Sequence, residues 1–242
     1  MKFGEFIQSQ AKSPVDQAVL EQICAFGMTT RPVWETDAQL KQFPAAEIVK
    51  ALRRFTKSKV LEAHPLHHGR YYFTFSIRTA ALVTDLDWQG GSYGERDKVK
   101  TFAKLLIGVK YLPGYEPLNT ARRQLLLGEQ VAGLPDVFMV DKSAKQLLLV
   151  RIDATPRAPA VRTAQRLRHD VFRLANTPEL KRLVQSKKLE LAVAACTPLR
   201  CRQIVKLFAA YERVGMVPVR HFALTELAPL FTSVQLGGLL DD

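Results

Sequence analysis

Residues 133–157, GLPDVFMVDKSAKQLLLVRIDATPR, decide the fold predicted for the larger part of the chain. Two apolar runs, 137–140 and 147–150, flank a polar stretch, which is the pattern of two antiparallel strands joined by a tight turn. With Ser143 and Ala144 at the tip, Asp136 lies opposite Arg151 and diagonal to Asp153. Opposed side chains share one face of a sheet, so these three charged groups are expected to cluster.

Helical and strand patterns alternate on both sides of this hairpin. This alternation predicts an α/β domain over 95–242. Its expected helices are 95–112, 158–176, 197–215 and 225–231, and its further strands are 189–196 and 217–224.

The first part of the chain has a different organisation. Ser13, Pro14 and Gly27 delimit a helical pattern, and further helices are expected at 36–43 and 44–59. Two β-rich runs around a Pro/His/Gly turn follow at 60–77. Three helices and a hairpin in this order predict a winged helix-turn-helix domain over 1–86, and the glycine-rich loop 87–94 marks the expected boundary.

Charge indicates a polyanionic partner. The 242 residues carry a net charge of +12, and the pI is about 9.8. Lys and Arg that neutralise phosphates release condensed counterions and so drive association with nucleic acid. A basic surface kept only for solubility is the alternative.

The expected recognition helix presents a polar face opposite Ile48, Leu52 and Phe55. Small residues at its start allow a close approach to bases, and the later cations reach phosphates. This helix and the following hairpin resemble the recognition helix and wing of bacterial winged-helix domains. The predicted DNA contacts are Ala45, Ala46, Lys50, Arg53, Arg54 and Lys57 on the helix, and His68 and Arg70 on the wing. A solvated helix face or a protein-binding module is the alternative, and so is a plain exposed turn for the wing.

A second basic stripe is expected in the helix at 158–176. Its buried side is predicted from Val161, Ala164, Leu167, Val171 and Leu174. The stripe Arg162, Arg166 and Arg173 then lies on another face, where it tracks a DNA backbone or is simply solvated.

The two acidic residues at the ends of the hairpin suggest a metal-binding site. Asp136 and Asp153 are a carboxylate pair suited to one Mg²⁺ or Mn²⁺, which needs few protein oxygens. Arg151 between them offsets their charge and weakens the field that holds a cation. No cofactor is therefore expected, and Mg²⁺ or Mn²⁺ only if the site is a nuclease site.

From 95 to 230, the order of helix, Pro-Asp hairpin, VRIDAT, arginine-rich helix and LAVAACTPLRCRQI resembles the replication-relaxation family of plasmid and mobile-element proteins. The resemblance implies a restriction-endonuclease-like domain behind a winged helix. Pro135 and Asp136 match its first strand, Asp153 the last acid of its second, and Arg166 or Arg168 its helix position. Arg151 stands where that pattern has an acid, which implies a degenerate site.

These observations predict a double-stranded-DNA-binding protein that acts in mobilisation, replication control or transcription of a plasmid or mobile element. Other transfer or replication proteins, or a second copy in a homodimer, are further expected partners. The alternatives are a metal-dependent nicking endonuclease or relaxase, with Asp136, Asp153 and Arg166 catalytic, and a protein-interaction adaptor. Three scattered cysteines and the lack of an apolar span predict a cytoplasmic protein without membrane contact.

Overall fold

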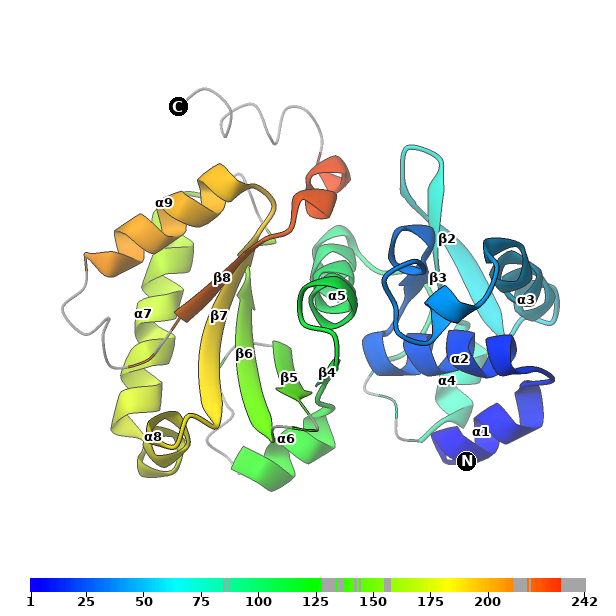
Figure 1. Cartoon of the computed structure of the whole chain (residues 1–242), viewed down its shortest axis with the longest axis horizontal. Helices are drawn as coiled ribbons and strands as arrows, with labels where there is room; N and C mark the ends of the chain where they lie inside the picture. The colour runs from blue at the N-terminus through cyan, green and yellow to red at the C-terminus, as the bar shows by residue number, and fades with distance from the viewer. Residues whose placement is uncertain are drawn as a thin grey trace. The chain divides into compact units, whose positions relative to one another are not determined.

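A computed structural model describes residues 1–84, 86, 88–127, 134, 137–141, 143, 145–154, 158–210, 217 and 219–231. The chain divides into two units, Met1–Pro113 and Gly114–Asp242 (Figure 1). Helices and two separate sheets make the structure mixed α/β, as predicted. No helix in the described ranges has both the length and the apolar character needed to cross a bilayer.

The first unit contains a three-stranded antiparallel sheet with the strand order β1-β3-β2. Ser13 accepts a hydrogen bond from the Asp16 amide at the start of α2, and Gly27 ends that helix in the left-handed region, at a φ of 87°. The elements are α1 (Phe3–Gln10), α2 (Pro14–Phe26), β1 (Thr29–Thr30), η1 (Arg31–Val33), η2 (Leu40–Gln42), α3 (Ala45–Lys57), β2 (Leu61–His67), β3 (Arg70–Phe75), α4 (Ile77–Leu82), α5 (Glu95–Leu106) and the π-helix η3 (Ile107–Tyr111).

The helix predicted at 36–43 is wrong, since this stretch forms only the short 3-10 helix η2. The Asp37 carboxylate accounts for the difference. One of its oxygens accepts hydrogen bonds from the backbone amides of Gln39 and Leu40, and the other accepts one from the Gln22 side chain at 2.7 Å. These bonds hold the backbone in a turn that competes with helix formation.

The boundary between the units differs from the predicted one. Helix α5 was expected to open the second domain, but it groups with the first unit, which ends at Pro113. The segment before α5 is tied to that unit, because the Tyr93 hydroxyl donates to the Gly27 carbonyl at 2.9 Å and the Tyr93 amide donates to the Tyr72 hydroxyl. The glycine-containing loop is therefore part of the first unit's packing.

The second unit contains a five-stranded sheet with the strand order β4-β5-β6-β7-β8. The first three strands pair antiparallel, whereas β7 and β8 join in parallel. The elements are β4 (Tyr115–Pro117), α6 (Thr120–Leu127), β5 (Val137–Asp141), β6 (Gln146–Ile152), α7 (Ala160–Asn176), α8 (Pro178–Gln185), β7 (Leu189–Ala195), α9 (Pro198–Ala209), β8 (Val219–Ala223) and the 3-10 helix η6 (Thr225–Leu230).

The register predicted for the hairpin is confirmed over its described residues. Val137 pairs with Val150, and Asp141 pairs with Gln146. Pro135, Asp136 and Ala144 lie outside the described residues. The register gives β6 one face that carries Leu147, Leu149, Arg151 and then Asp153.

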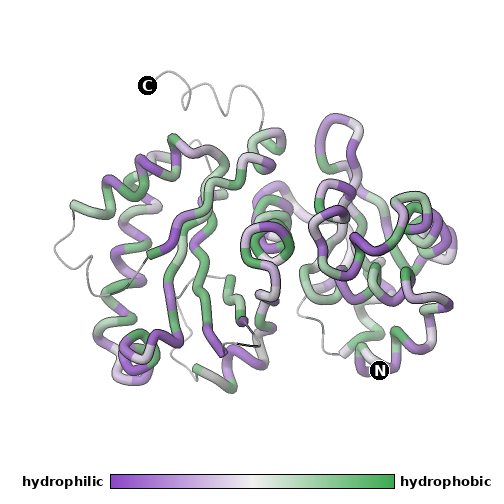
Figure 2. The backbone as a smooth tube through the Cα atoms, viewed as in Figure 1, coloured by the Kyte–Doolittle hydropathy of each residue, from purple (hydrophilic) through white to green (hydrophobic). Residues whose placement is uncertain are grey.

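Helices α7, α8 and α9 cover one face of this sheet (Figure 1). Figure 2 shows hydrophobic residues along the central strands and an alternation of hydrophilic and hydrophobic residues along α7. Four of the five core positions predicted on α7 are buried, but Val161 is 37% exposed because it lies in the first turn, on the solvent side. The core between the sheet and the helices includes Leu147, Leu149, Ala164, Leu167, Val171, Leu174, Leu191, Val193 and Ile204.

Cys196 and Cys201 are buried, and burial raises the pKa of both thiols to about 11. Only about one such thiol in a thousand is ionised at pH 8, and the thiolate is the reactive form. We expect a disulfide reagent at pH 8 to label half-buried Cys24 before these two, which label on denaturation in urea. Peptide mapping checks the order, and rapid native labelling of Cys196 or Cys201 would contradict it.

The same two thiols predict a pH dependence of stability. Their native pKa lies above the ordinary value of 9.0, so the native state holds these protons more tightly than the unfolded chain. Each protonated thiol contributes ~2 kcal/mol to the free energy of unfolding, and this contribution is complete below about pH 9 and is lost as the pH rises towards 11. Cys201→Ala is expected to flatten the fall of the urea midpoint between pH 8.5 and 11, and an unchanged slope would contradict this.

Candidate nucleic-acid interface

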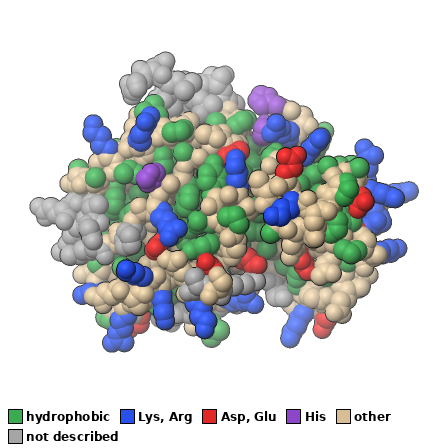
Figure 3. Space-filling view, in the orientation of Figure 1, with side chains coloured by type: hydrophobic (Ala, Val, Ile, Leu, Met, Phe, Trp, Pro, Cys, Tyr) green, Lys and Arg blue, Asp and Glu red, His purple; other side chains and the backbone are tan. Residues whose placement is uncertain are grey.

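The outer face of α3 carries the side chains predicted to contact DNA. Ile48, Ala51, Leu52 and Phe55 turn to the core, which fixes the opposite side of the helix in solvent. Figure 3 shows Lys and Arg side chains gathered at the edge of the molecule where α3 lies. The exposed residues of this face are Ala45, Ala46, Glu47, Lys50, Arg53 and Lys57.

Arg54 was predicted to belong to this face, but the structure gives it a different partner. Its guanidinium forms an ion pair with Asp16, whose side chain is fully buried, and it also lies over the Phe55 ring. The second Asp16 oxygen accepts a hydrogen bond from the Lys12 amide at 2.9 Å. Arg54 therefore joins α3 to α2, and its position is set by a buried carboxylate.

The β2–β3 hairpin presents His68 and Arg70, which are both exposed as predicted for a wing. His64 instead bonds to the Thr74 hydroxyl at 3.1 Å, and burial lowers its pKa. The pKa of His67 is also lowered, first by burial and then by Arg70 and His68. His64 and His67 are therefore less readily protonated than ordinary histidines, and Arg70 is a permanent cation of the hairpin turn.

Asp153 was predicted to bind a metal ion or to act as a catalytic residue, but both of its oxygens are engaged within the protein. One accepts a hydrogen bond from the Thr163 hydroxyl at 3.0 Å, and the other accepts from Arg200 Nε at 2.6 Å. Its side chain is only 2% exposed, and that of Arg200 only 4%. Asp153 is thus half of a buried ion pair that joins β6 to α9.

Arg151 was expected to lie between Asp136 and Asp153. The structure directs it to α7 instead, where its Nε and Nη2 donate to the two oxygens of Asp170 at 3.0 and 2.6 Å. Burial raises the pKa of the Asp170 carboxyl, and the two hydrogen bonds from Arg151 oppose that shift. Asp136 lies outside the described residues, so its part in the expected cluster stays a prediction.

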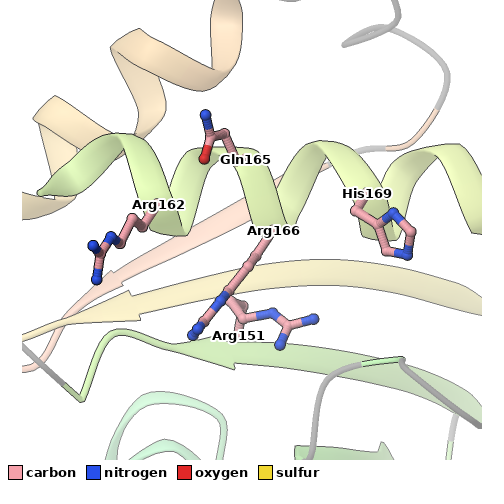
Figure 4. Close-up of a pocket in the computed structure, with 5 residues that line it drawn as sticks. All are labelled: Arg151, Arg162, Gln165, Arg166 and His169. Atoms are coloured by element: carbon pink, nitrogen blue, oxygen red, sulfur yellow. The ribbon is translucent and has the colours of Figure 1, made fainter. Parts of the chain in front are cut away.

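A basic pocket of about 430 Å³ lies between α7 and the end of β6. In Figure 4, Arg162, Arg166 and His169 point from α7 towards the side where Arg151 lies, and Gln165 points the other way. No acidic side chain of the described residues lines this basic pocket. Its lining residues are Arg151, Arg162, Gln165, Arg166 and His169.

The basic pocket contains two of the three arginines predicted on α7. Arg173 is half-buried and is not among its lining residues. His169 and Gln165 were missed, although His169 follows Arg162 and Arg166 by seven and three positions, the same helical spacing that identified the arginines. The place of Arg151 in this pocket could not be predicted, because it depends on how β6 packs against α7, and the local sequence does not indicate that packing.

Metal ligands do not gather in the parts of the chain that the structure describes. Within those parts, no group of three or more His, Cys, Asp or Glu side chains lies close enough to hold an ion. Comparison with known proteins adds no assignment: no family model, curated protein or solved structure matches this chain.

Proposed function

We propose that this chain is a double-stranded-DNA-binding protein in which the first unit works as a winged helix-turn-helix. The observation that carries the proposal is the exposed face of α3, where Lys50, Arg53 and Lys57 lie on the side opposite the core. Alanines at the start of α3 leave room for a groove, and an antiparallel hairpin with an exposed Arg70 follows the helix.

In this proposal the second unit is a nuclease-like domain that has lost its metal chemistry and extends the DNA footprint. The order of antiparallel hairpin, arginine-rich helix and parallel strand supports the resemblance to the replication-relaxation family. The ion pair that occupies Asp153 favours binding over nicking, because the carboxylate is not available to a cation without displacing Arg200. Mobilisation, replication control and transcriptional regulation of a plasmid or mobile element are the roles that this resemblance suggests.

The test is the salt dependence of binding to duplex DNA, measured by fluorescence anisotropy on the whole chain. In the variant Lys50→Ala with Arg53→Ala, affinity is expected to fall by about tenfold or more. The slope of log K against log[salt] should flatten by about 1.8, since each lost phosphate contact changes it by about 0.9. Arg54→Ala is unsuitable here, because it strips a buried carboxylate of its partner.

The matched control removes two other exposed cations of the same unit, Lys2→Ala with Lys12→Ala. It lowers the net charge equally and should leave the slope nearly unchanged. Equal effects of the two variants would mean that binding follows net charge rather than α3. No retention of duplex DNA at low salt would overturn the proposal in favour of a protein-interaction adaptor.

A further inference from the structure

The basic pocket on α7 holds more positive charge than the described residues around it neutralise. Arg151 is compensated by Asp170, which accepts both of its hydrogen bonds. The Arg162 and Arg166 side chains have no ion pair with any residue that the structure describes. Among the residues that the structure describes, Arg162 and Arg166 are therefore the two guanidinium groups of the pocket that no carboxylate neutralises.

The position of Arg162 makes this charge costly for the helix itself. It lies in the first turn of α7, which carries no acidic residue and has no side-chain cap. The amino end of a helix has a partial positive charge, so a cation there is unfavourable and an anion is favourable. An anion in the basic pocket would relieve both the repulsion between the arginines and the repulsion from the helix end.

The size of the pocket limits what this anion is. The pocket is an open depression, since Arg162, Arg166 and His169 are exposed, and its volume of about 430 Å³ is larger than a lone phosphate requires. Arginine binds phosphate oxygens through two parallel N–H groups, which suits the paired guanidiniums.

We propose that the basic pocket binds a phosphate monoester of nucleotide size. Two unmatched guanidiniums complement the charge of a monoester, about −1.5 to −2 at neutral pH, better than the single charge of a backbone diester. The site therefore distinguishes the phosphorylated end of a nucleic-acid strand, or a free mononucleotide, from the interior of a strand. This inference goes beyond the proposed duplex binding by α3 and does not depend on it.

The test is isothermal titration calorimetry of the whole chain with thymidine 5′-monophosphate and with its 5′-methyl diester at pH 7.5 and low salt. The monoester is expected to bind about tenfold or more tightly than the diester. Arg166→Gln should weaken monoester binding by about tenfold, the usual effect of losing one charge-assisted hydrogen bond. Arg202→Gln, which removes an exposed arginine of α9 outside the pocket, is the matched control and should bind as the wild type does.

Two further titrations identify the source of the phosphate. A trithymidylate with a 5′-phosphate that binds more tightly than the mononucleotide, while its 5′-hydroxyl counterpart does not bind, indicates a strand end. Binding of the mononucleotide alone indicates a free nucleotide, and either result supports the site. Equal affinities for monoester and diester, no binding of the monoester, or no effect of Arg166→Gln would overturn it. Lys50→Ala with Arg53→Ala should leave monoester binding unchanged. A failure of the duplex-binding proposal can therefore be told apart from a failure of the pocket proposal.

Discussion

Replacing Asp153 by alanine is expected to destabilise the second unit by about 3–5 kcal/mol, the usual effect of leaving a buried charge without its partner. The orphaned group is the Arg200 guanidinium, which is 4% exposed and bonds to Asp153 at 2.6 Å. The loss is large against the stability of about 5–15 kcal/mol typical of a whole domain. Urea unfolding followed by circular dichroism, with EDTA present, measures it.

Two further variants sharpen this experiment. The double change Asp153→Leu with Arg200→Met removes both charges, and it should be more stable than Asp153→Ala even though it alters more atoms. Glu179→Ala removes an exposed carboxylate from the first turn of α8 and should change stability by less than about 1 kcal/mol. If Asp153→Ala is as stable as the wild type in EDTA, the ion pair is not structural and a metal role for Asp153 returns.

Arg151→Glu is expected to be the second most damaging change, at about 3 kcal/mol or more near pH 7. The substitution restores the acid that the nuclease resemblance has at this position, but it sets a carboxylate against Asp170. The Asp170 side chain is fully buried, and Arg151 forms an ion pair with it. Thermal unfolding of the variant against the wild type measures the loss.

The loss in Arg151→Glu should depend on pH with a definite sign. Burial already raises the pKa of Asp170, and removal of Arg151 raises it further. A raised native pKa means that stability is lost as the pH rises through it, so the deficit is largest at pH 7 and shrinks towards pH 5. Arg151→Lys keeps the charge and should lose only about 1–2 kcal/mol, through the missing second hydrogen bond. A stable Arg151→Glu protein that gains further stability with Mg²⁺ would favour the nicking endonuclease.

Local sequence patterns were sufficient for the elements whose hydrogen bonds are themselves local. The polar turn between 141 and 146 fixed the strand register, so the pairing of Val137 with Val150 was predictable. The apolar spacing of Ile48, Leu52 and Phe55 likewise fixed which side of α3 is exposed. The turn at Asp37 was not predictable from local spacing, because its second partner is Gln22 in α2.

The charged residues of the candidate site depended on partners far along the chain. Arg54 and Asp16 are 38 positions apart, and Asp153 and Arg200 are 47 apart. Helical periodicity predicts that an arginine lies at the edge of a buried helix face, but it does not predict whether a carboxylate from another element lies beside it. It therefore identified Arg162 and Arg166, which remain exposed, but it did not reveal the ion pair of Arg54. The hairpin register likewise placed Arg151 beside the acids of its own hairpin and did not reveal its ion pair with Asp170.

The two edge strands of the second sheet bear on how the protein behaves at high concentration. Strand β4 at one edge has three residues and ends at Pro117, which has no N–H to offer an incoming strand. Strand β8 at the other edge carries exposed Arg220 and His221, and Arg220 is paired with Glu190 of the neighbouring strand. Short, proline-ended or charged edges resist the addition of strands from other molecules. Growth of this sheet into dimers or fibrils by edge-to-edge strand pairing is thus disfavoured.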